Sequence, residues 1–131
     1  MKRQGMLNSH ISKVLSDLGH TDLIVIADAG LPIPSDVPRI DLALTLGVPS
    51  FAEVVEAVSD DMVVEKVVLA SEIQENNENT LQFMKKTFSD TEIEFLSHEE
   101  FKEKTKVAKV VIRTGEVTPY ANCILQAGVI F

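Results

Sequence analysis

Apolar positions recur along this chain with two alternating periods, one typical of helices and one typical of strands. Residues 9–19 carry apolar side chains at helical spacing and end at Gly19, a common helix stop. Ser50–Glu53 and Ser97–Glu100 have the pattern of a capping box, which predicts a helix start at each. The helices predicted in this way cover residues 9–19, 50–58, 79–88 and 97–104.

Runs rich in β-branched residues predict strands between these helices. Leu23–Ala27 is apolar throughout, as is typical of a strand buried on both faces of a parallel sheet. Prolines within Leu31–Pro38 exclude a helix or a central strand there, because each proline lacks a backbone donor. The predicted strands cover residues 23–27, 40–44, 62–70, 92–96, 107–112 and 123–131.

Strands that alternate with helices indicate an α/β fold, with a mostly parallel central sheet and helices on both faces. The length of 131 residues predicts a single domain spanning 1–131. The apolar end, Ala127–Phe131, is unusual because chain ends normally lie in solvent. We expect it to be held in the core or in a subunit contact.

Composition narrows the classes of partner. The net charge of −8 argues against nucleic acid and against an anionic membrane surface, because both require a basic face. No apolar run is long enough to cross a bilayer, and the basic N-terminus is not followed by the apolar stretch of a secretory signal. The single Cys123 cannot form an intrachain disulfide, which favours a reducing compartment. We therefore expect a cytoplasmic protein without membrane insertion.

The first candidate for chemistry is the strand 23–27 with His20 before it and Asp28 after it. Histidine is the side chain whose unperturbed pKa lies nearest neutrality, so His20 suits proton transfer. An equally good interpretation is that His20 is an ordinary polar residue of a loop. Asp28 precedes Ala29-Gly30, so it is also read as a turn residue that accepts from the following backbone amides.

A second group of candidates lies near the other end of the chain. Tyr120 and Asn122 both offer a donor and an acceptor suited to hydroxyl groups, and they equally suit a turn after Pro119. His98 follows a predicted helix cap and is otherwise read as a surface residue. No His or Cys spacing predicts a metal site, and no glycine-rich phosphate motif or nucleophile elbow is present, so no cofactor is expected.

Several blocks of the chain resemble the family of ribose pyranases and fucose mutarotases. These blocks follow the family in order and spacing over essentially the whole chain: Met1–Asn8, Gly19–Asp22, Ile26–Pro34, Ile112–Glu116 and Pro119–Asn122. The resemblance implies an isomerase of D-ribose ring forms without a cofactor. It also implies a homo-oligomer, a decamer of two stacked pentameric rings, with sites in clefts between subunits and a place beside ribose transport components.

By the same resemblance His20 is the proton donor, and the sugar contacts are Asp28, His98, Tyr120 and Asn122. Asp28 would orient His20 or accept from a sugar hydroxyl, and His98 or a water would be the base. Eight residue steps separate His20 from Asp28, roughly 26 Å when fully extended. Either the chain folds back near Thr21, or the two residues of one site come from different subunits.

Three alternatives stay open. A sugar-binding accessory subunit of a ribose transporter would use the same contacts but would not need His20. A mutarotase acting on fucose or another sugar would differ only in pocket shape. A phospho-acceptor domain is suggested by Asp28 at a strand end, but the neighbouring acidic pair that would hold magnesium is missing.

Overall fold

A computed structural model of residues 1–131 contains one six-stranded sheet in the order β2-β5-β1-β6-β3-β4. β6 runs antiparallel to both of its neighbours, and the other pairings are parallel. The predicted α/β class with a mostly parallel sheet is therefore confirmed. The strands are β1 (Leu23–Ala27), β2 (Arg39–Asp41), β3 (Val64–Ala70), β4 (Glu92–Leu96), β5 (Val110–Arg113) and β6 (Cys123–Ala127).

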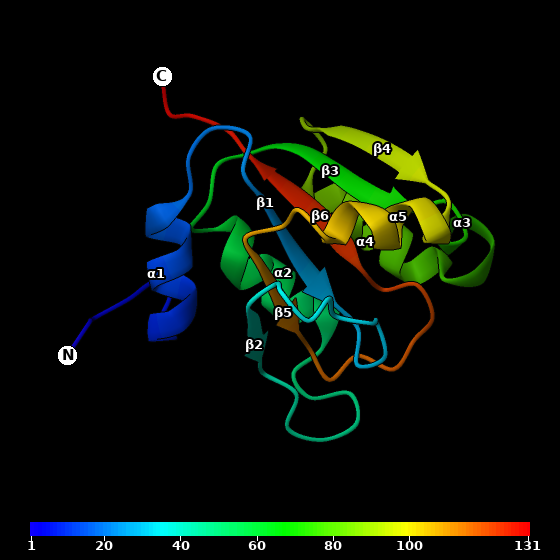
Figure 1. Ribbon diagram of the computed structural model, residues 1–131, viewed down its shortest axis with the longest axis horizontal. Coiled ribbons are helices and arrows are strands. Elements are labelled where there is room, and N and C mark those ends of the chain that lie inside the picture. The colour runs from blue at the N-terminus through cyan, green and yellow to red at the C-terminus, as the bar shows by residue number, and fades with distance from the viewer.

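Helices cover both faces of this sheet, as predicted (Figure 1). One face packs against α2 and α4 through Phe51, Val55 and Met84, all essentially inaccessible to solvent. The other face packs against α5 through Phe101, together with the loop that follows β1. The helices are α1 (Ser9–Asp17), α2 (Phe51–Ser59), α3 (Ile73–Asn76), α4 (Glu78–Thr87) and α5 (His98–Thr105).

β1 is the most enclosed strand of the sheet. All five of its residues are buried, because β5 and β6 pair with its edges and side chains cover both faces. The predicted continuous apolar run is thus a central strand. Residues 20 and 28 flank it at its two ends, so the turn at His20–Thr21 does not bring them together.

Several predicted boundaries were wrong. β6 ends at Ala127, and the tail beyond it is exposed, with Ile130 and Phe131 almost fully accessible, so this chain's own core does not hold it. β5 begins only at Val110, because 107–109 form a turn. The acidic run after β3, for which no helix was predicted, contains the short helix α3, whose Ile73 is fully buried.

A close backbone approach joins the end of β5 to the loop after β2. A Cβ on Gly115 would lie 2.4 Å from the Val48 carbonyl oxygen and 2.6 Å from that of Thr45. Hydrogen bonds from Gly115 to the Pro49 carbonyl and from Gly47 to the Gly115 carbonyl hold the two loops together. Only a glycine fits this contact.

We therefore expect Gly115→Ala to lower the free energy of unfolding by about 1–3 kcal/mol or more, because backbone carbonyls cannot move aside as side chains do. Urea denaturation measures the change. Gly19→Ala is the matched control, since a Cβ there meets only one atom, at 3.6 Å. Equal stability of the two variants would contradict the prediction.

Candidate functional site

Asp28 and Asn122 form a two-point contact where β1 ends and β6 begins. The Asp28 amide donates to Asn122 Oδ1 at 2.7 Å, and Asn122 Nδ2 donates to Asp28 Oδ2 at 3.0 Å. Asp28 Oδ1 also accepts from the amides of Gly30 and Leu31, so the turn role considered for Asp28 is confirmed. The antiparallel β1–β6 pairing brings these residues together from positions 94 apart in sequence.

His98 and Tyr120 meet beside this pair. Their rings contact edge to face, with centroids 5.2 Å apart at 82°. A cavity of about 310 Å³ is lined by both rings, by Asp28 and by the loop segments 30–32 and 119. The cavity has the size of a small-molecule site and combines aromatic rings with a carboxylate. Three of the five predicted site residues thus line this cavity, and a fourth, Asn122, is joined to them by its hydrogen bonds with Asp28.

The backbone around Tyr120 is locally unusual. Tyr120 has φ 57°, a left-handed conformation that non-glycine residues seldom adopt. Its carbonyl accepts from the Asn122 amide, and Asn77 Nδ2 donates to the preceding Pro119 carbonyl. These contacts hold the ring toward the cavity. Such strain clusters at functional sites, where the surrounding structure maintains it.

One polar residue that the sequence did not identify, Glu72, holds His98 in place. The Glu72 carboxylate accepts from the His98 amide at 3.0 and 3.1 Å, which attaches α3 to the start of α5. His98 Nδ1 is buried without a hydrogen-bond partner, which leaves Nε2 as the ring nitrogen with solvent access. Glu72 lay in an acidic run with no motif, so only the three-dimensional contact identifies it.

His20 lies at the opposite end of β1, away from the cavity. Its Nε2 is 2.8 Å from Glu65 Oε2, at the start of β3. The Thr21 amide donates to the Ala127 carbonyl, which places His20 beside the end of β6 rather than its beginning. Within one chain Asp28 therefore does not orient His20, and of the two geometries expected only the one that uses different subunits is compatible with this fold.

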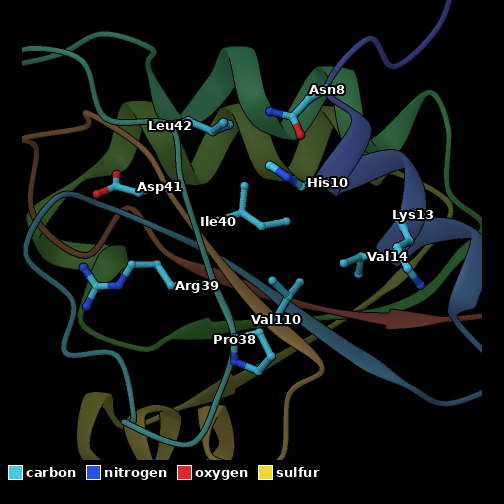
Figure 2. A pocket seen from close by; sticks show the side chains of 10 residues that line it. All are labelled: Asn8, His10, Lys13, Val14, Pro38, Arg39, Ile40, Asp41, Leu42 and Val110. Atoms are coloured by element: carbon cyan, nitrogen blue, oxygen red, sulfur yellow. The ribbon is translucent and has the colours of Figure 1, made fainter.

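A larger cavity of about 510 Å³ lies between α1 and the edge strand β2 (Figure 2). It is lined by His10, Lys13 and Arg39 together with apolar side chains, and it contains none of the predicted sugar contacts.

Nowhere do three or more His, Cys, Asp or Glu residues group in a way that could hold a metal ion. None of the helices has the length and apolarity needed to cross a membrane.

Thr114 and Glu116, which follow β5, hydrogen-bond to Ala27 and Thr118, the chain neighbours of Asp28 and Pro119 in the smaller cavity. Thr114 is buried, and its hydroxyl donates to the Ala27 carbonyl at 2.8 Å. The Glu116 carboxylate accepts from the Phe51 amide at the start of α2 and from Thr118. Burial raises the pKa of Glu116, but these hydrogen bonds more than offset it, so the pKa lies below its ordinary value.

Comparison with known proteins defines the class. The model of the RbsD / FucU transport protein family matches residues 1–130, and the chain belongs to this family. The resemblance seen in the sequence is thereby confirmed. Two solved structures share the fold. FucU from Bifidobacterium longum is 26% identical over 95% of this chain and 96% of that one, with a TM-score of 0.78. The fucose mutarotase of Streptococcus pneumoniae is 24% identical over 95% of each chain, with a TM-score of 0.77.

Relatives with higher sequence identity to this chain are named D-ribose pyranase. The D-ribose pyranase of Bacillus velezensis is 64% identical over 131 residues, and that of Exiguobacterium sibiricum is 65% identical, each covering both chains completely. The structure of Bacillus subtilis RbsD complexed with D-ribose is 60% identical, covers 100% of both chains and superimposes with a TM-score of 0.98.

Glu116→Gln tests whether the ionised Glu116 carboxylate stabilises the folded state through its hydrogen bonds. A carboxyl whose pKa is lowered in the folded state stabilises it above the unfolded pKa, and this stabilisation is lost as pH falls. We expect the variant to be about 1 kcal/mol less stable than the wild type at pH 7, with the difference shrinking as pH falls below the ordinary glutamate pKa of about 4.3. Urea denaturation from pH 3 to 8 measures it, and a difference independent of pH would contradict the assignment.

Proposed function

We propose that this protein is a D-ribose pyranase, an isomerase that interconverts the β-pyranose and β-furanose forms of D-ribose by general acid–base catalysis. The observation that carries the proposal is the cavity at the end of β1, where Asp28, His98 and Tyr120 converge. The ribose complex of a relative with the same fold and 60% identity supports the choice of sugar.

The reaction opens one hemiacetal and closes another. Opening requires a proton on the ring oxygen and removal of the proton from the anomeric hydroxyl, after which the bond between C1 and the ring oxygen breaks. Closure through a different hydroxyl reverses both transfers, so the sugar gains and loses no net proton. In our proposal His20 gives the first proton, and His98, through Nε2, is the candidate base. A positioned acid or base contributes typically 10²- to 10⁴-fold.

The other residues hold the sugar. Asp28 Oδ2 accepts from a sugar hydroxyl while Asn122 fixes its orientation, and the second amide proton of Asn122 serves a further hydroxyl. Tyr120 offers its hydroxyl and the face of its ring. Lys102, one helical turn after His98, pairs with Glu99 at 2.7 Å, and we assign it no contact with the sugar.

The position of His20 leads us to propose sites shared between subunits of a homo-oligomer. His20 and the other four residues lie at opposite ends of β1, so a neighbour's His20 completes each cavity. The apolar tail begins beside His20, through the Thr21–Ala127 hydrogen bond, and Ile130 and Phe131 within it are exposed. The chain after β6 runs away from the sheet to the C-terminus (Figure 1). Burial of this tail against a neighbour would stabilise a contact at the His20 end.

The assembly we propose is the decamer of two stacked pentamers that the resemblance implies, in the cytoplasm, beside the components of ribose uptake. The lone Cys123 is buried in β6, where burial raises the pKa of its thiol, in keeping with a structural role.

A second candidate function is a non-catalytic sugar-binding protein of ribose transport, which the family description as transport proteins favours.

His20→Ala separates the two functions. We expect it to slow the exchange between β-pyranose and β-furanose, measured by saturation-transfer NMR on D-ribose, by at least about 100-fold while ribose still binds. Asp28→Ala is expected to weaken binding. Co-assembly of the two variants should restore part of the activity, because some cavities then combine an intact His20 with an intact Asp28. Binding by the wild type without catalysed exchange would favour the transport reading.

Ile130→Asp tests the tail. A charge in an apolar contact is costly, so we expect smaller assemblies by sedimentation velocity and a parallel loss of exchange activity. Val107→Asp is the control, because Val107 is also exposed, at 71%, but lies in the turn before β5. Full assembly and activity of Ile130→Asp would exclude the tail from the subunit contact.

A further inference from the structure

Glu65 occupies a break in the pairing of β3 with β6. Val64 lies opposite Ala127 and Lys66 lies opposite Gln126, so Glu65 is the extra residue of a β-bulge. Bulges redirect a side chain that would otherwise follow the strand's alternation, and they are enriched beside active sites. This one directs the only acidic side chain that contacts His20.

Two side chains meet the two oxygens of this carboxylate. Oε2 lies 2.8 Å from His20 Nε2, and Gln126 Nε2 donates to Oε1 at 2.7 Å. Gly128 leaves room for the arrangement, because a Cβ there would lie 3.2 Å from Glu65 Cβ and 3.1 Å from Val63 Cγ1. The bulge, the amide and the glycine together hold the carboxylate against one edge of the imidazole.

The charge of Glu65 decides which nitrogen of His20 carries a proton. Hydrogen bonds from Gln126 and then from His20 lower the pKa of Glu65, so the group is ionised at neutral pH. An ionised carboxylate only accepts hydrogen bonds, and Nε2 must therefore be the donor. The other ring nitrogen, Nδ1, is left for proton exchange.

We propose that Glu65 is a positioning residue for His20, which holds Nε2–H and thereby makes Nδ1 the atom that delivers the proton to the sugar ring oxygen. The inference rests on the proposed function and deepens it. In the imidazolium form both nitrogens are protonated, and the negative carboxylate stabilises this donor form. After transfer, Nδ1 recovers its proton from the hydroxyl that closes the new ring.

Other charged groups near this end of the sheet are engaged elsewhere. Asp22 Oδ2 accepts from the Gly19 amide, and its Oδ1 lies 3.9 Å from Lys109 Nζ. Lys66 pairs with Glu94 and lies 3.6 Å from Glu92. The terminal carboxylate of Phe131 lies four residues beyond Ala127, at the end of the exposed tail.

Glu65→Gln tests the proposal, because it keeps the size of the side chain and removes its charge. By saturation-transfer NMR at several ribose concentrations, we expect kcat to fall roughly tenfold to a hundredfold, part of what a general acid contributes, with KM nearly unchanged. Glu65→Asp, which keeps the charge, should retain more of the rate.

Glu92→Gln is the matched control, since it removes a strand carboxylate that pairs with Lys66 instead of His20. All variants are compared at concentrations where sedimentation shows the wild-type assembly. Long-range ¹H–¹⁵N spectra, assigned with His20→Ala, should show neutral His20 protonated at Nε2 in the wild type.

Two results would overturn the inference while leaving the proposed function standing: a wild-type kcat in Glu65→Gln, or a neutral His20 protonated at Nδ1. Undiminished exchange by His20→Ala would instead overturn the proposed role of His20 and, with it, that of Glu65.

Discussion

One buried, extended strand sets the positions of the candidate site residues in this molecule. β1 is paired on both edges and covered on both faces, so its five residues stay extended at about 3.3 Å each. His20 and Asp28 are consequently held apart at its two ends, and no side-chain rotation can bring them together. A rigid strand gives each end a precise position, but it also prevents a single chain from using both ends on one small molecule.

The antiparallel strand β6 organises both ends at once. Because it runs opposite to β1, its first residues lie beside Asp28 and its last beside His20. Asn122, just before β6, fixes Asp28 through two hydrogen bonds, and Gln126, near its end, fixes Glu65 against His20. A parallel strand in this place would have reversed the order and separated both pairs. One exception to parallel order thus supports two sets of polar residues.

The sequence was sufficient for the fold class because the apolar runs are long and the two capping boxes are clear. Ser50 and Ser97 both begin helices with complete capping boxes. It also selected four residues that the fold brings together, although His98 and Tyr120 were individually weak candidates. What it missed depends on long-range contacts: Glu72 and Glu65 sit in segments without a motif, and their partners are 26 and 45 positions away. The end of β6 was misplaced because an apolar tail exposed on one chain has the same pattern as a buried strand.

The proposal that neighbouring subunits share each site, with His20 and Asp28 at opposite ends of one strand, has a consequence for symmetry. With sites shared between neighbours, an open row of chains always leaves one unmatched set at each extremity. A closed arrangement, whether a two-fold pair or a ring, leaves none, and most homo-oligomers adopt such closed symmetry. Catalytic output per chain would then depend on closure itself. Dilution that opens the assembly would inactivate these sites even though every chain remains correctly folded.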